Sequence, residues 1–115
     1  MILATLLLLA QVIVPSPTPS TLKLLWDHPG TNVDKFLVCV DALPCTDVPL
    51  TAALPAETPQ TPGLKVYGVA WPSMTPGTHS LIVKASFLGA EAAATSLPVT
   101  LVVVTAPTGL RAKTP

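Results

Sequence analysis

Residues 79–88 read HSLIVKASFL, and two kinds of side chain alternate along this stretch. Successive side chains of an extended strand point to opposite faces of a sheet. One face then carries His79, Leu81, Val83 and Ala85, and the other carries Ser80, Ile82, Lys84 and Ser86. The mostly apolar first set predicts a strand that lies on a hydrophobic core.

Residues 34–41 (DKFLVCVD) show a similar alternation. Phe36, Val38 and Val40 are predicted to face the core, which places Leu37 and Cys39 on the outer face. Other short strand-like runs, separated by Pro and Gly turns, cover residues 22–26, 45–50, 64–71 and 97–105, with residues 10–14 as one more candidate. About seven short strands in roughly 100 residues predict a β-sandwich.

The composition fits one small all-β domain. The chain has 115 residues, of which 14 are Pro, and this frequency of Pro argues against long helices. Six basic residues balance six acidic ones, so no basic stripe is available to neutralise phosphates. Nucleic acid is therefore not an expected partner.

Four stretches carry a resemblance to a known family: LKLLWDHPG (22–30), VDKFLVCVD (33–41), LKVYGVAWPSMTPGTHSLIVKA (64–85) and TSLPVTLVVV (95–104). In this order they resemble a fibronectin type III domain or a related immunoglobulin-like module of bacterial surface and phage virion proteins. The similarity covers about residues 10–105.

The resemblance implies that Trp26 ends the second strand and that Phe36 opens the third. It also implies a Pro-Gly-Thr turn, matched at residues 76–78, before the sixth strand. His79 stands where the family usually has a Tyr that bonds back to the backbone, and a His can donate a similar bond. The expected core anchors are Trp26, Phe36, Val38, His79, Leu81 and Val83.

The N-terminal residues 1–14 carry no charge and are almost wholly apolar. A signal peptide, a membrane anchor and a first strand with its Leu run buried against a partner chain are all compatible with this pattern. A Pro-rich connector (15–21), the sandwich (22–106) and a tail (107–115) are expected to follow. The candidate interface residues in the first segment are Leu6, Leu8, Val12 and Val14.

The last predicted strand is apolar on both faces, and no charge occurs from residue 92 to residue 110. An exposed edge strand of this kind invites pairing with another chain. Either another subunit covers it, or the sheet partner and loops of the same chain do. The candidate interface residues here are Val99, Leu101, Val102 and Val104.

Cys39 and Cys45 flank a short loop and would face each other in a hairpin centred on Ala42. A disulfide is geometrically possible, and two reduced thiols are the alternative. The spacing matches no common zinc pattern, and no catalytic or nucleotide-binding motif is present, so neither a metal, a cofactor nor an enzymatic activity is expected.

Loops at the ends of a sandwich are its usual binding elements. The candidates are residues 27–32, 51–63 and 88–93, with Asp27, His28 and Asn32 as the most polar group. A solvated loop is the simpler interpretation of His28, and Trp71 is expected either to cover the core or to be an exposed anchor.

These features predict a non-enzymatic structural or binding module, most concretely a virion-surface, decoration or tail-associated assembly protein. Its partners would be other protein subunits, through self-association or through a capsid, tail or surface scaffold, in an extracellular setting. The alternative is a secreted or membrane-tethered recognition domain that binds carbohydrate or protein through its end loops. Membrane contact is expected only through residues 1–14.

Overall fold

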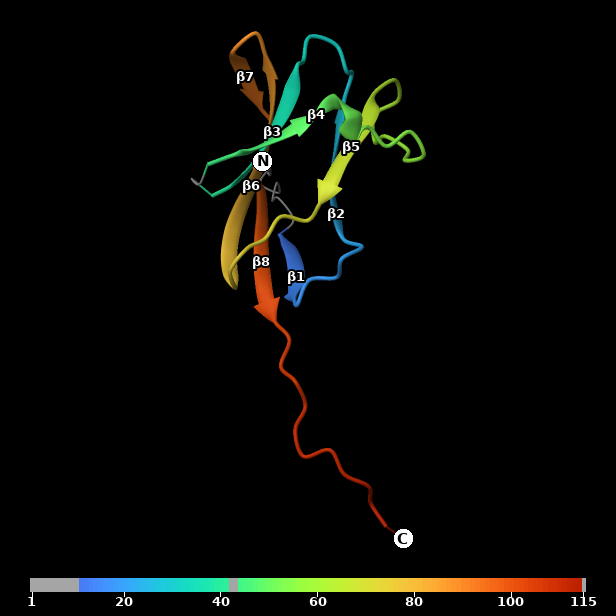
Figure 1. The fold of residues 1–115 in the computed structure, drawn as a ribbon, viewed down its shortest axis with the longest axis vertical. Coiled ribbons are helices and arrows are strands. Elements are labelled where there is room, and N and C mark those ends of the chain that lie inside the picture. Colours follow the sequence, from blue (N-terminus) through green and yellow to red (C-terminus); the bar gives the residue numbers. More distant parts are fainter. Residues whose placement is uncertain (1–10, 42–43, 115) are drawn as a thin grey trace, which may run out of the picture.

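The computed structural model describes residues 11–41 and 44–114. It is an all-β protein with eight strands in two sheets, an arrangement consistent with a β-sandwich (Figure 1). The strands are β1 (Val12–Ser16), β2 (Lys23–His28), β3 (Lys35–Val40), β4 (Thr46–Pro49), β5 (Lys65–Ala70), β6 (Gly77–Phe87), β7 (Ala90–Ala93) and β8 (Leu97–Val103). A short 3-10 turn, Leu50–Ala52, is the only helical element of the described residues.

The larger sheet has the order β1-β8-β6-β3-β4, and β7 pairs with the far end of β6. Strands β1 and β8 run parallel, while the other pairs of this sheet are antiparallel. The second sheet consists of β2 and β5 in antiparallel register. Because β6 is eleven residues long, β8 and β7 follow one another along the same side of it.

Side chains from both sheets form one hydrophobic core. Phe36, Leu81, Val14 and Val99 are its largest fully buried members, and they meet Leu24 and Tyr67 of the smaller sheet. The Phe36 ring lies 5.3 Å from the Trp26 ring and 4.7 Å from the Tyr67 ring, measured between centroids. Val38 is also buried, and Trp26 and Val83 pack against the core from its margin.

The outer face of β3 is covered. Leu37 and Cys39 lie on the face opposite Phe36 and Val38, as expected, and both are buried there. Leu37 lies opposite Asp47 of β4 and Lys84 of β6, so that ion-paired side chains surround it, and Cys39 is bonded to Cys45. A central strand with neighbours on both sides can be buried on both faces even in an antiparallel sheet.

The last strand is paired on both sides within the chain, the second of the two arrangements considered for it, so β8 is not an edge. It lies between β1 and β6, and β1 is the edge strand of this side of the sheet. Strand β7 was not predicted and falls in a region expected to be a binding loop. β1 overlaps the candidate first strand at residues 10–14 and extends into Pro15 and Ser16 of the expected connector.

Beyond β8 the chain continues as an extended tail that leaves the body at the bottom of Figure 1. We call this end of the body the lower end. The opposite end, where β3 begins and β6 meets β7, is the upper end (Figure 1).

Candidate interaction surface

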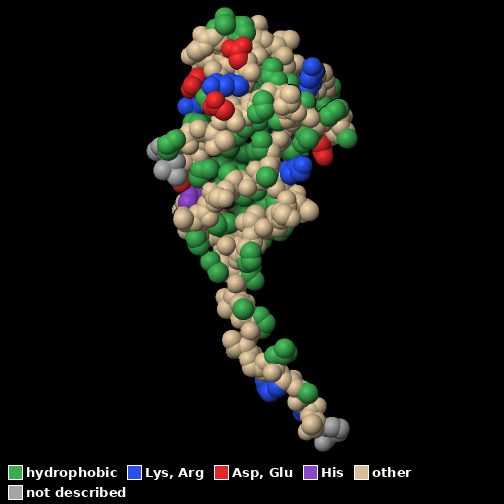
Figure 2. All heavy atoms as spheres, viewed as in Figure 1, with side chains coloured by type: hydrophobic (Ala, Val, Ile, Leu, Met, Phe, Trp, Pro, Cys, Tyr) green, Lys and Arg blue, Asp and Glu red, His purple; other side chains and the backbone are tan. Residues whose placement is uncertain are grey.

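Strands β1 and β8 bring two uncharged segments side by side. No charged residue occurs from residue 11 to residue 22 or from residue 92 to residue 110, and these segments contain the paired strands. Figure 2 shows charged side chains gathered toward the upper end, while the lower part of the body is mostly apolar or neutral in this view.

The alternation of the strands identifies the outward side chains at the lower end. Val14, Val99, Leu101 and Leu81 point into the core, so the residues between them face outward. We name this outward surface the uncharged face; it comprises Ile13, Pro15, Thr78, Ser80, Pro98, Thr100 and Val102.

The apolar side chains of the uncharged face are accessible to solvent. Ile13 is 61% exposed and Val102 is 47% exposed, and Val104 continues the exposed apolar surface beyond the end of β8. The amide side chain of Gln11 donates a hydrogen bond to the hydroxyl of Thr100 at its upper margin. Contiguous apolar surface with neutral polar neighbours is typical of a protein contact surface.

Only part of the predicted interface is available on this surface. Val14, Val99 and Leu101 are buried in the core of the chain itself, because the alternation along β1 and β8 points these side chains inward, and Val12 is partly buried against the same core. Val102 and Val104 are exposed. Leu6 and Leu8 lie outside the described residues.

The free edge of β1 is protected by Pro15. The backbone N–H of Val104 donates to the carbonyl of Ser16 at 2.9 Å, so Ser16 directs its backbone toward β8. Backbone groups alternate along a strand, and Pro15 therefore faces the open edge, where it has no N–H to offer. Proline at such an edge discourages strand addition, which leaves the face rather than the edge for contact.

Cys39 and Cys45 form a disulfide, with their Cα atoms 4.3 Å apart. The bond closes the turn between β3 and β4, and Asp41 lies within the closed loop. The backbone of Asp41 has a φ of 55°, in the left-handed region that non-glycine residues adopt less often. The disulfide therefore constrains a turn that carries a carboxylate.

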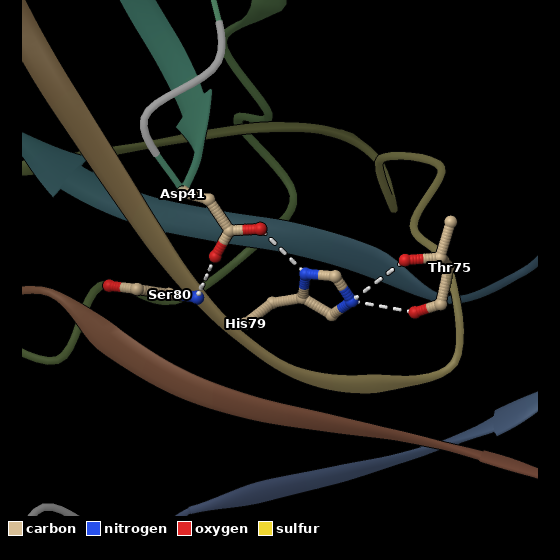
Figure 3. A network of polar contacts seen from close by, with 4 residues as sticks. All are labelled: Asp41, Thr75, His79 and Ser80. Atoms are coloured by element: carbon tan, nitrogen blue, oxygen red, sulfur yellow. Dashed lines mark hydrogen bonds and ion pairs between the residues drawn. The ribbon is translucent and has the colours of Figure 1, made fainter.

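Asp41, His79, Thr75 and Ser80 form a polar network beside this turn (Figure 3). The Nδ1 atom of His79 lies 2.7 Å from Oδ2 of Asp41, and its Nε2 atom lies 2.6 Å from the carbonyl oxygen of Thr75. The Asp41 carboxylate also accepts the Ser80 N–H at 2.9 Å. The bond to Thr75 is a backbone bond of the kind expected for His79.

The network shifts the ionisation of both partners. The hydrogen bond to the Asp41 carboxylate, followed by the one to the Thr75 carbonyl, raises the pKa of His79 above its ordinary value. The bond from His79 and that from the Ser80 N–H lower the pKa of Asp41. Both partners are therefore held in their charged forms over a wider range of pH.

The predicted loop residues make local contacts, and Asp27 also lines a hollow together with Thr58 and Gln60. Asp27 accepts the backbone N–H of Gln60 at 2.8 Å, and Nδ1 of His28 accepts that of Gly30 at 2.9 Å. The His28 ring lies against Phe36, and desolvation lowers its pKa. Asn32 is exposed with a φ of 55° in a turn. These three residues thus have local structural roles.

Trp71 is half-buried and packs against the core, which fits the expected covering role. Its indole nitrogen and that of Trp26 are buried without a hydrogen-bond partner in the described chain. Among residues 11–41 and 44–114, no cluster of His, Cys, Asp and Glu has a metal-binding arrangement.

No protein-family model matches the chain, and a comparison with curated proteins finds no significant match. Within the part of the chain that the structure describes, no helix is long and apolar enough to cross a membrane.

Proposed function

We propose that this chain is a non-enzymatic β-sandwich module that docks onto other protein subunits of a larger extracellular assembly. The uncharged face and the neighbouring Val104 form the contact surface. A component of a virion surface, decoration or tail is the most concrete form of this proposal, and the sandwich belongs to the fibronectin type III-like class.

The uncharged face is the single observation that carries the proposal. Ile13 and Val102 leave apolar surface in water next to hydroxyl and proline side chains, and neither β1 nor β8 carries a charged residue. Burying apolar area stabilises a complex by about 25 cal/mol per Å² before the costs of association are subtracted. A charge introduced at the centre of such a contact would be buried without a partner.

Two features support the fibronectin type III-like class. A five-strand path faces a two-stranded sheet, and Trp26 and Phe36 pack together between them, where the resemblance places core aromatic residues. The mixed pairing, with β1 parallel to β8 and β6 antiparallel to β8, brings the first and last strands together. A module of this kind presents one whole sheet face to a neighbour.

The proposal is tested by adding a charge to the face. Tagged full-length protein is expressed in its native source, and particles are separated on a density gradient. Wild-type protein is expected to sediment with particles, whereas Ile13→Lys and Val102→Lys are expected to remain at the top of the gradient.

Leu25→Lys provides the matched control, because Leu25 is 45% exposed on β2 of the other sheet. This variant is expected to sediment like the wild type. Equal sedimentation of all three variants with particles, with circular dichroism showing that each is folded, would contradict the proposal.

A further inference from the structure

Two hydrogen bonds between Asp41 and Ser80 hold the turn between β3 and β4 against β6. The Asp41 N–H donates to the Ser80 carbonyl at 2.8 Å, and the Ser80 N–H donates back to the Asp41 carboxylate. The Cys39–Cys45 disulfide closes the same turn. Asp41, which places its carboxylate beside β6, therefore lies between the two bonded cysteines.

The contacts of His79 favour the protonated imidazole, in which both ring nitrogens carry a proton. Asp41 Oδ2 and the Thr75 carbonyl oxygen are both hydrogen-bond acceptors, so both ring nitrogens must donate for the network in Figure 3 to be satisfied. The side chain is only 11% exposed, so water has little access to replace a lost partner. A neutral ring would leave one of the two contacts as a pair of acceptors.

The contact with Thr75 holds the segment of residues 71–76, which connects β5 to β6. Trp71 and Met74 of this segment pack against the core, and the Trp71 N–H donates to the Leu22 carbonyl at 3.1 Å. Within the described residues, His79 provides the side-chain hydrogen bonds that tie this segment to β6. Ser73 and Met74 also line a hollow that reaches Ser16 and Leu101 at the lower end.

We propose that the disulfide and His79 form a redox-coupled pH latch that holds residues 71–76 against the lower end of the sandwich. The latch is closed when the disulfide is intact and the imidazole is protonated. It opens when the imidazole loses its proton, and it opens at lower pH once a dithiol has reduced the disulfide. In that step the S–S bond breaks, two electrons and two protons pass to form two S–H groups, and the dithiol closes to its own disulfide.

The latch has a simple electrostatic environment. Asp41 is the charged group that faces His79 within the described residues, because β8 and residues 71–76 carry no titratable side chain. The raised pKa of His79 agrees with this arrangement. Asp41 supplies the negative charge that stabilises the protonated imidazole of His79. A looser turn at Asp41 is therefore expected to lower the proton affinity of His79.

Thermodynamic linkage makes this coupling reciprocal. If the intact disulfide raises the proton affinity of His79, protonation of His79 must stabilise the disulfide against reduction by the same factor. Reduction by a dithiol is therefore expected to become more favourable as the pH rises through the range in which His79 titrates.

The test is an NMR titration of the two histidines in full-length protein. The Cε1–H signals of His79 and His28 are followed against pH for the oxidised protein, for protein reduced with dithiothreitol and for a Cys39→Ser/Cys45→Ser variant. We expect the proton affinity of His79 to fall about fivefold or more without the disulfide, a typical size for coupled sites. The affinity of His28, on the opposite side of the core, should stay the same.

An Asp41→Asn variant shows whether the carboxylate transmits the effect. In this variant the proton affinity of His79 should be low and independent of the disulfide. In wild-type protein, the equilibrium constant for reduction by dithiothreitol should rise with pH by the same factor that separates the two His79 affinities.

Three results would overturn the proposal. The first is an equal His79 affinity in oxidised, reduced and Cys-to-Ser protein. The second is a parallel shift of His28, which would indicate a change of the whole domain. The third is collapse of the dispersed spectrum on reduction, which would make the disulfide a support of the entire fold rather than of this latch.

Discussion

The two ends of the sandwich present opposite kinds of surface on the same core. At the upper end, Lys35 pairs with Asp47 at 3.0 Å and Lys84 with Glu91 at 3.4 Å. At the lower end, the uncharged face exposes Ile13 and Val102 on β1 and β8, two strands without a charged residue. Charged surface keeps a small protein soluble, whereas apolar surface favours association. The upper end is thus suited to contact with solvent, and the lower end to contact with another protein.

The largest expected effect on stability comes from a substitution in the hydrophobic core, which both ends share. Phe36 is fully buried, and its ring contacts Trp26 and Tyr67. Phe36→Ala is expected to lower the free energy of unfolding by about 3–5 kcal/mol, because it removes buried apolar area and leaves a cavity. Urea unfolding measures this loss, and a loss below about 1 kcal/mol would show that the core does not depend on this ring.

The disulfide should have the next largest effect. Cys39→Ser/Cys45→Ser is expected to cost about 2 kcal/mol, the value that the chain-entropy model gives for so short a loop. Urea unfolding of the variant, without reductant, measures the loss. The variant should remain folded with the upper ion pairs intact, and an unchanged midpoint would contradict a stabilising role for the bond.

The free energy of unfolding is expected to depend on pH through the Asp41–His79 pair at the lower end. The raised pKa of His79 makes its contribution complete below 6.5 and lost as the pH rises through that raised value. The lowered pKa of Asp41 makes its contribution complete above 3.8 and lost as the pH falls through the lowered value. The pair is therefore expected to stabilise most between pH 3.8 and 6.5.

Urea unfolding across this pH range tests the dependence. His79→Gln should remove the decline above pH 6.5, which is the ordinary pKa of the ring. His28→Gln serves as the matched control and should leave that decline in place. A decline that persists in His79→Gln would assign it to another group.

The smallest effect is expected from the upper ion pairs. Lys35 and Asp47 are both well exposed, so Lys35→Ala should change the free energy of unfolding by less than about 1 kcal/mol. The difference from wild type should shrink further in high salt, because exposed charges are screened. A loss that is larger and insensitive to salt would mean that the Lys35 stem covers Leu37 through packing rather than through charge.

The strand content was predictable because local alternation and turn residues determine it. Phe36, Val38 and Leu81 could be assigned to the core from their spacing alone, and the structure buries all three. Strand β7 could not be predicted in this way, since its sequence AEAA has little alternation or β-propensity. It forms a strand because the upper half of β6, beyond the end of β8, offers it a partner.

The candidate site was less predictable, because it depends on contacts between distant residues. Asp41 and His79 are 38 positions apart, and only the pairing of β3 with β6 brings them together. Asp41 was not among the candidate site residues, although its place inside the Cys39–Cys45 loop was a usable signal. Val14 and Val99 are buried in the core, because hydrophobic character on both sides of a strand does not reveal which face is turned toward the other sheet.

The parallel pairing of β1 with β8 also has a mechanical consequence. The chain enters β1 at Val12, beside Val99, and leaves β8 at Val103, beside Ser16, at the opposite end of the pair (Figure 1). Tension applied to the two ends of the chain would pull these strands past each other along their length. The hydrogen bonds between them would then be loaded in shear and would have to break together rather than one by one. A domain built in this way resists stretching along the direction of these two strands.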